Sequence, residues 1–160
     1  MMELAPAETP EQIEEVRRLL REYEAALGVS LCFQGFEREL AALPGEYAPP
    51  AGRLLLALEA GQVVGCVALR RLDEETCEMK RLYVRPKFRG LGVGKALAKS
   101  IVDCAVGIGY AKMRLDTVPS MHSAISLYSS LGFREIAPYR YNPIQGAKFM
   151  EVNLHRGENW

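Results

Sequence analysis

The stretch from Glu78 to Leu97, EMKRLYVRPKFRGLGVGKAL, decides the fold of this chain. Its first part, residues 78–84, has the composition of a β-strand, and its last part begins a long helical pattern. The turn between them holds three alternate glycines, Gly90, Gly92 and Gly94. A strand, a glycine-rich turn and a helix in this order direct unpaired backbone N–H groups toward an anion. The sequence therefore predicts that this turn holds a phosphate or pyrophosphate.

Two common phosphate motifs do not fit the glycine turn. The dinucleotide-binding fingerprint requires a third glycine where this chain has Leu97. The P-loop requires glycine where this chain has Arg89, and Ser or Thr where it has Ala96, which argues against a magnesium nucleotide. What remains is the pattern R-x-x-G-x-G, formed by Arg89, Gly92 and Gly94.

A second motif follows about thirty residues later, and the two together resemble a known family. It reads A-x-x-L-Y-x-x-x-G-F and is formed by Ala124, Leu127, Tyr128, Gly132 and Phe133. In this order and at this spacing, the two motifs resemble the GNAT superfamily, the acyl-CoA-dependent N-acyltransferases. The resemblance is strong over residues 53–154 and implies that acetyl-CoA is the cosubstrate and an amine the acceptor.

Length and charge limit the classes of function. The chain has 160 residues, which suits a single domain over residues 1–160. Its 20 acidic and 20 basic residues cancel, so we expect neither nucleic acid nor a membrane as a partner. A homodimer is compatible with the resemblance.

The cysteines and histidines argue against a metal site. The four cysteines show no C-x-x-C spacing and only two histidines are present, so we expect no metal. With no signal peptide and no long apolar run, we expect a reduced, cytoplasmic protein. Residues 157–160 are expected to form a loose tail.

The hydrophobic pattern predicts an α/β (α+β mixed) fold. An N-terminal helix after Thr9 and Pro10 leads into an antiparallel meander, whose first two strands meet at a hairpin through Ala60 and Gly61. The helix after the glycine turn then returns the chain to the same sheet, which implies a right-handed parallel crossover. The result is a GNAT-like mixed sheet with helices on both faces. We expect the ligand at the splayed carboxyl ends of the strands that begin at Cys77 and Ala111.

The third strand of the meander changes its apolar phase. Cys77 and Met79 are on odd positions, whereas Leu82 and Val84 are on even positions. A β-bulge near residues 80–81 would reconcile the two halves. The alternative is a strand that is buried on both faces. In the family that the chain resembles, a bulge here separates two parallel strands and frees backbone groups for the thioester.

The resemblance also implies a set of residues that bind the cosubstrate. The pyrophosphate anchor would be Arg89, Gly90, Leu91, Gly92, Val93, Gly94 and Lys95. The pantetheine arm would bind along Leu82, Tyr83 and Val84, mainly through their backbone groups. Where relatives often have an asparagine, this chain has Met121, and Ser123 or Ser126 would have to replace its contact.

The resemblance implies that Tyr128 is the general acid that protonates the leaving thiolate. The alternative interpretation is that Tyr128 only packs in the core. A lysine-like amine has a pKa near about 10.4, so its attack near neutral pH needs a base. The best candidate for the base is Glu78, acting through water. The alternative interpretation is that Glu78 is an exposed carboxylate on a strand without a catalytic role. Asp116 on the neighbouring strand is the reserve.

The acceptor pocket is the least determined part. Residues that we expect in it are Cys32, Phe33, Phe36, Asp116, Tyr139, Tyr141 and Asn142. The cluster around Phe33 and Phe36 is open to a second interpretation, ordinary core filling. This mixture of aromatic and polar residues favours a small amine with an apolar part as the acceptor over a polycation. We expect an N-acetyltransferase for a primary amine of a small molecule or amino acid derivative; the alternatives are a non-catalytic acyl-CoA sensor and an unliganded structural domain.

Overall fold

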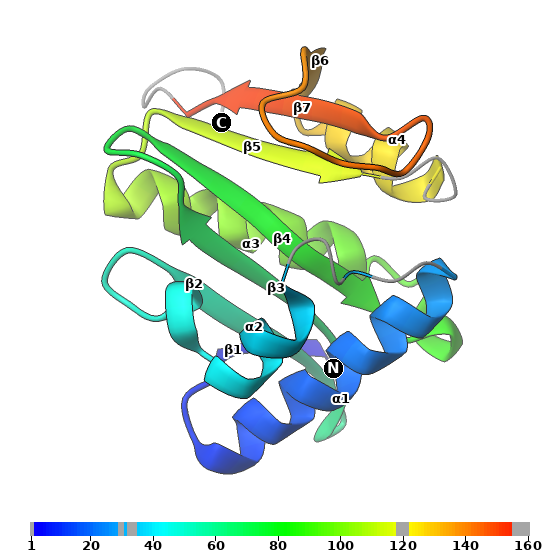
Figure 1. Ribbon diagram of the computed structural model, residues 1–160. Coiled ribbons are helices and arrows are strands. Elements are labelled where there is room, and N and C mark those ends of the chain that lie inside the picture. The colour runs from blue at the N-terminus through cyan, green and yellow to red at the C-terminus, as the bar shows by residue number, and fades with distance from the viewer. Residues whose placement is uncertain (1, 29–30, 32–34, 118–121, 155–160) are drawn as a thin grey trace.

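A seven-stranded mixed sheet forms the centre of the computed structural model (Figure 1). The structure describes residues 2–28, 31, 35–117 and 122–154, with the side chains of residues 122 and 123 excluded. The strands, in chain order, are β1 (Met2–Pro6), β2 (Arg53–Glu59), β3 (Gln62–Arg71), β4 (Thr76–Val84), β5 (Lys112–Thr117), β6 (Arg134–Ile136) and β7 (Lys148–Asn153). Their order across the sheet is β1-β2-β3-β4-β5-β7-β6. The pair β4–β5 is parallel, and the other neighbouring pairs are antiparallel.

Helices cover both faces of this sheet (Figure 1). On one face lie α1 (Pro10–Leu27) and α2 (Phe36–Ala42), and on the other lie α3 (Val93–Ile108) and α4 (His122–Ser130). Two 3-10 turns, η2 (Gly45–Tyr47) and η3 (Pro86–Phe88), connect elements. The predicted fold class is therefore confirmed, including the parallel crossover through α3. The predicted tail at residues 157–160 lies outside the described residues.

Local sequence signals explain where α1 begins and ends. The Thr9 side chain accepts from the N–H of Gln12 at 3.1 Å, and the Gln12 side chain accepts from the N–H of Thr9 at 2.9 Å. This reciprocal pair satisfies N–H groups that the first turn leaves without partners. The helix ends at Gly28, whose φ of 72° is the left-handed conformation that glycine adopts at low cost.

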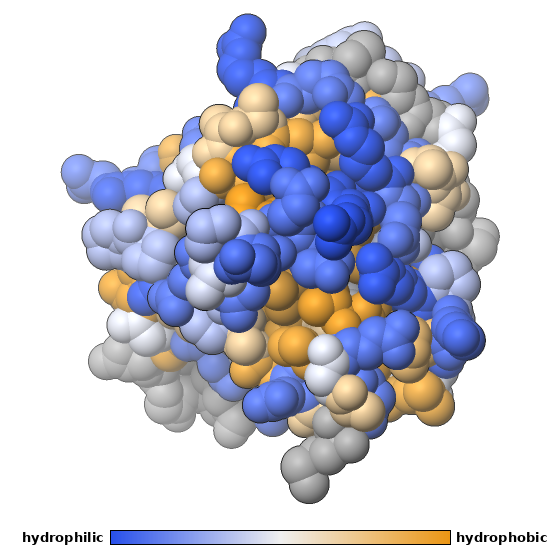
Figure 2. All heavy atoms as spheres, turned by 90° about the horizontal axis from the view of Figure 1, so that it is seen from below, coloured by the Kyte–Doolittle hydropathy of each residue, from blue (hydrophilic) through white to orange (hydrophobic). Residues whose placement is uncertain are grey.

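The outer face of α1 carries charges, as its sequence predicts. Ion pairs along it join Glu14 to Arg17 at 2.9 Å and Arg21 to Glu37 of α2 at 2.9 Å. Figure 2 shows the molecule from below the view of Figure 1, with a largely hydrophilic surface interrupted by smaller hydrophobic areas. The opposite face of α1 is apolar and buried, so α1 is an amphipathic helix.

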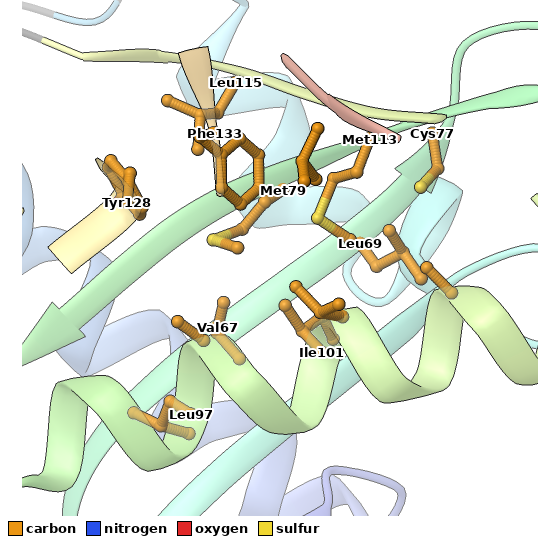
Figure 3. Packing of buried hydrophobic residues seen from close by; sticks show 14 of the residues in the cluster. Val67, Leu69, Cys77, Met79, Leu97, Ile101, Met113, Leu115, Tyr128 and Phe133 are labelled. Carbon is orange, nitrogen blue, oxygen red and sulfur yellow. The ribbon is translucent and has the colours of Figure 1, made fainter. Parts of the chain in front are cut away.

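Two hydrophobic cores hold the helices to the sheet. Against one face, Leu97 and Ile101 of α3 pack on Val67 and Met79 (Figure 3), and all four side chains are almost fully buried. Against the other face, the apolar stripe of α1 and α2 packs on alternate residues of β2 and β3 and on Tyr83 of β4. Because both faces are covered, β4 is buried along most of its length.

The β4 strand separates from β5 after a short paired segment. Residues 76–78 of β4 pair with residues 112–114 of β5, and both strands then continue beyond their last recorded pair. The pairing of β4 with β3 shifts its register between Cys66 and Ala68 of β3. On β4, Arg81 has a positive φ of 62°. The predicted bulge is thus confirmed. The alternative prediction, a strand buried on both faces, also holds in part, because the first six residues of β4 are all buried.

The described part of the chain contains no helix that is long and apolar enough to cross a membrane.

Candidate acyl-transfer site

The glycine turn forms the entrance to α3. Gly90 and Gly92 have φ values of 80° and 84°, and Gly92 is the residue immediately before the helix. A Cβ atom at either position would meet nothing within 4 Å, so these two glycines are required by backbone conformation and not by crowding. The first N–H groups of α3 consequently lie beside an open turn, where the helix dipole adds positive potential.

The side chains around this turn are exposed, and Arg89 also contacts the end of β4. Arg89 Nε donates to the Val84 carbonyl at 2.9 Å, and its guanidinium lies 5.7 Å from the centre of the Tyr83 ring. These contacts tie the turn to the end of β4. Leu91 and Lys95 are exposed, and Leu91 keeps 69% of its surface accessible. The turn itself is therefore an accessible surface with a fixed backbone.

A cavity of about 40 Å³ lies beside the divergence of β4 and β5, and we call it the β4–β5 cavity. Its wall combines apolar, charged and hydroxyl groups from α1, β4, β5, α4 and the 139–147 loop. The residues that line it are Tyr23, Leu27, Leu31, Met79, Lys80, Arg81, Leu82, Asp116, Thr117, Tyr128, Asn142 and Ile144. Tyr128, Asp116 and Asn142, three of the residues expected at the site, thus meet at one cavity.

Tyr128 contributes its side chain from α4 to the wall of this cavity. It is 7% exposed, and its ring lies 5.8 Å from that of Phe133 in a tilted arrangement (Figure 3). Burial raises the pKa of its hydroxyl, and the nearby Tyr23 and Asp116 raise that pKa further. The hydroxyl is therefore protonated at neutral pH and able to donate a hydrogen bond.

Glu78 is fully buried and hydrogen-bonded to side chains of the neighbouring strand β3 and of the loop after β6, and we call this group the Glu78 cluster. Its Oε1 accepts from Arg70 Nε at 2.8 Å, and its Oε2 accepts from the Tyr139 hydroxyl at 2.6 Å and from Arg140 Nη2. Burial acts to raise the pKa of Glu78, but the charges of Lys80, Arg140 and Arg70 outweigh it and hold the pKa below its usual value. Glu78 is not among the described residues that line the β4–β5 cavity.

Asp116 and Asn142 form a pair in the cavity wall. Asn142 Nδ2 donates to Asp116 Oδ2 at 3.1 Å, while Asn142 Oδ1 accepts from the N–H of Ile144 at 3.0 Å. The loop after β6 is thereby connected to the carboxyl end of β5. Asp116 is partly exposed, in contrast to Glu78.

The other residues expected at the acceptor end are distributed differently. Phe36 is 1% exposed in the core, with the Arg81 guanidinium 5.2 Å from its ring centre. Tyr139 packs against Phe149 with ring centres 5.2 Å apart and belongs to the Glu78 cluster. Tyr141 is 74% exposed. Cys32 and Phe33 lie outside the described residues, so that part of the expectation stays a prediction.

The residues expected to contact the pantetheine arm lie on β4 and α4. Leu82 and Val84 are partly buried and lie beyond the last β4–β5 pair. Ser126 is exposed on α4. The side chain of Ser123 is outside the description, and so is all of Met121.

Lys80 is one of several cavity residues that the sequence analysis did not predict. It is 6% exposed and lines the β4–β5 cavity next to Arg81. Burial and the charge of Arg81 lower the pKa of its ammonium group to about 8, against the opposing effect of Glu78 and Asp116. The available signal was the pair Lys80-Arg81 within a predicted central strand, because buried lysines are uncommon.

The guanidinium of Arg81 contacts Glu39 of α2. Its Nη2 lies 2.7 Å from Glu39 Oε1, and its Nε donates to Glu39 Oε2 at 2.9 Å. This two-point contact is the strong geometry of arginine and carboxylate. Among the described residues, no group of three or more histidine, cysteine or acidic side chains is placed to hold a metal ion.

Comparison with known proteins shows the family of this chain. Residues 13–133 match the family described as acetyltransferase (GNAT) family. An uncharacterized N-acetyltransferase of Schizosaccharomyces pombe is 37% identical over 96% of this chain and 95% of its own length. The N-acetylaspartate synthetase of Homo sapiens is 34% identical over 68% of this chain but 38% of its own length.

A solved structure agrees on the fold. The crystal structure of a GNAT-family acetyltransferase from Staphylococcus aureus matches with a TM-score of 0.81, at 22% identity, over 97% of this chain and 100% of that one. The chain belongs to the GNAT acetyltransferase family, and its sequence relatives are N-acetyltransferases.

Proposed function

We propose that the chain transfers the acetyl group of acetyl-CoA to a primary amine of a small molecule or amino acid derivative. One observation carries this proposal: the open glycine turn at the entrance to α3 lies at one end of the divergence between β4 and β5, and Tyr128 faces the cavity beside it. The name of the Homo sapiens relative, N-acetylaspartate synthetase, supports an amino acid as the kind of acceptor.

In this proposal the pyrophosphate binds to the backbone of residues 89–95. The evidence in favour is the pair of positive-φ glycines and the accessible first turn of α3. The pantetheine arm lies along Leu82, Tyr83 and Val84, whose strand has separated from β5 at this point. A backbone N–H in this segment polarises the thioester carbonyl, as an oxyanion donor does.

The transfer is a direct attack. The neutral amine nitrogen bonds to the carbonyl carbon of the thioester, and the carbon–sulfur bond then breaks. A base takes one proton from the attacking nitrogen, and the departing thiolate receives a proton, so that free CoA thiol and an N-acetyl product result. Tyr128 is the group proposed to donate to the sulfur, and its protonated state at neutral pH supports this role.

Two carboxylates are candidates for the base. Glu78 acting through water is the proposal from family resemblance, and it requires a water to reach a fully buried carboxylate that already accepts three hydrogen bonds. Asp116 is supported by its place in the wall of the β4–β5 cavity with Tyr128. The pH–rate profiles of Glu78→Gln and Asp116→Asn decide between them, because removal of the base abolishes the acidic limb.

Release of free thiol from acetyl-CoA against a panel of primary amines tests the proposal. We expect release that depends on both the amine and the enzyme, with an N-acetyl product detected by mass spectrometry. If acetyl-CoA binds but no amine in the panel promotes release, the chain is better explained as a non-catalytic acyl-CoA sensor. If acetyl-CoA does not bind, both interpretations are wrong.

A further inference from the structure

A hydrogen bond between two side chains joins the loop after β6 to the carboxyl end of β5. Asn142 Nδ2 donates to Asp116 Oδ2 at 3.1 Å, and both residues line the β4–β5 cavity together with Tyr128. Both side chains of the pair are partly exposed, in contrast to the fully buried Glu78. The pair therefore belongs to the part of the cavity wall that a substrate can contact.

A second contact of Asn142 determines how its amide group is oriented. Asn142 Oδ1 accepts from the backbone N–H of Ile144 at 3.0 Å. A backbone N–H only donates and an ionised carboxylate only accepts, so the amide oxygen must face Ile144 and the amide nitrogen must face Asp116. This position needs a donor and an acceptor on one short side chain, and asparagine supplies both.

The contact with Asn142 engages one of the two oxygens of Asp116. Within the described part of the chain, no hydrogen bond reaches the other oxygen, Oδ1. Glu78, by comparison, accepts from three side chains. A general base must come within hydrogen-bond distance of the proton that it removes. Asp116 can accept an amine at Oδ1 without losing its contact with Asn142.

We propose that Asn142 is a positioning residue for Asp116: its amide holds Oδ2, and Oδ1 takes the proton from the attacking amine. This inference rests on the proposed acetyltransferase function, and it favours Asp116 over Glu78 as the base. The nitrogen forms its bond to the acetyl carbon and loses one proton to Oδ1, so that the carboxylate becomes a carboxyl group. The carbon–sulfur bond breaks, and the departing thiolate receives its proton from Tyr128.

The competing role for Asn142 is structural, because its two hydrogen bonds also hold the loop after β6 in place. Asn142→Asp separates the two roles, since the new carboxylate keeps an acceptor for the N–H of Ile144 but has no donor for Asp116. We expect kcat to fall about 10- to 100-fold, because a hydrogen bond to a charged group contributes about that factor. The KM for acetyl-CoA should be nearly unchanged.

The acceptor for these measurements is chosen by assay of the wild-type protein. It is the compound with the highest kcat/KM among the common L-amino acids and the amines that lack their carboxyl groups. Gln145→Glu is the matched control, because it adds a negative charge to the same loop at an exposed residue outside the cavity wall. This control should keep the wild-type kcat.

A double-mutant cycle links the effect to Asp116. In the Asp116→Asn background, Asn142→Asp should cause little further loss of kcat, because the carboxylate that Asn142 positions is already absent. The double variant again has one amide and one carboxylate at the two positions, with their places exchanged. A structural role would therefore return both stability and kcat toward the wild type, whereas the proposal predicts that kcat stays as low as in Asp116→Asn.

The outcomes separate this inference from the function beneath it. A loss of kcat in Asn142→Asp that disappears in the Asp116→Asn background supports the inference. Wild-type kcat in Asn142→Asp or in Asp116→Asn, or losses that multiply in the double variant, would overturn it while the acetyltransferase function stands. If the wild type acetylates no amine, the function and the inference are both wrong.

A second variant keeps the test decisive should Asn142→Asp fail to fold. Asn142→Ser adds no charge, and its hydroxyl can still accept from the N–H of Ile144. The hydroxyl oxygen lies one bond closer to the backbone than the amide nitrogen, so it does not reach Asp116. The same loss of kcat is expected in this variant, and wild-type kcat would contradict the inference.

Discussion

The Glu78 cluster and the β4–β5 cavity adjoin each other along β4 and place buried charge in different surroundings. Glu78 has its oxygens bonded by Arg70, Tyr139 and Arg140, so the protein itself neutralises the charge. Two residues later, Lys80 is 6% exposed and lines the β4–β5 cavity. A buried carboxylate held by three donors chiefly organises the fold, whereas the side chains that line the cavity form a surface that a substrate can reach.

Loss of the Tyr128 hydroxyl should give the largest effect on activity and should leave the stability of the fold nearly unchanged. We expect Tyr128→Phe to lower kcat by roughly 10³-fold, because an acid or base in the transition state contributes about 10²–10⁴-fold. The KM for acetyl-CoA should change little, and stability should be nearly unchanged, since Tyr128 packs on Phe133 through its ring. Steady-state kinetics and thermal unfolding measure the two quantities. Equal rates in the variant and the wild type would remove Tyr128 from the mechanism.

Neutralisation of Glu78 should instead act on stability. Glu78→Gln leaves Arg70 and Arg140 beside a neutral group, and breaking a buried pair costs on the order of 4 kcal/mol. The folded-state pKa of Glu78 is lowered, so the wild-type advantage is present above the unfolded pKa of about 4.3 and disappears as the pH falls through the folded value. Urea unfolding at pH 7 and at lower pH measures both effects. Asp116→Asn is the comparison variant, and its loss should be clearly smaller, because Asp116 is partly exposed.

Stability should also reveal the cost of the Lys80 charge. Its folded pKa is lowered from 10.5 to about 8, so between these values the unfolded chain binds more protons than the folded chain. The free energy of unfolding of the wild type should therefore rise relative to Lys80→Met as the pH increases from 8 to 10.5, by up to about 3 kcal/mol. The difference between the two proteins removes the contributions of other titrating groups. A difference that is constant with pH would show that Lys80 is not buried as a charge.

The smallest effect concerns the glycine turn. Gly92→Ala places a side chain at a φ of 84° and should cost about 1–2 kcal/mol of stability. The matched control is Gly107→Ala inside α3, where nothing lies within 4 Å of an added Cβ and alanine should instead stabilise by about 0.5–1 kcal/mol. Thermal unfolding of both variants measures the contrast. Equal shifts in the same direction would mean that Gly92 does not need its left-handed conformation.

Features set by neighbouring residues could be predicted from the sequence. The capping box of Thr9 and Gln12, the hairpin at Ala60 and Gly61, and the glycine turn each depend on a few adjacent side chains. The bulge near Arg81 was also accessible, because a phase shift in an alternating strand is a local signal. These features determined the fold class.

The charge partners could not be predicted in the same way. Arg140 and Tyr139 reach Glu78 from about sixty residues further along the chain, and nothing local specifies that contact. Phe36 was open to two interpretations because an aromatic residue in an irregular segment suits a pocket or a core, and it lies in the core. Lys80 was missed because its importance depends on a cavity that exists only after α1, α4 and β5 have packed around it.

The claim that the entrance to α3 binds the pyrophosphate of CoA is tested most directly by calorimetric titration. Coenzyme A and pantetheine, which lacks the pyrophosphate and the nucleotide, are titrated into the wild-type protein under the same conditions. We expect coenzyme A to bind with one site per chain and pantetheine to bind at least about 100-fold more weakly, since phosphate contacts to a helix N-terminus are charge-assisted. Equal affinity for the two compounds, or no heat of binding with coenzyme A, would contradict the account.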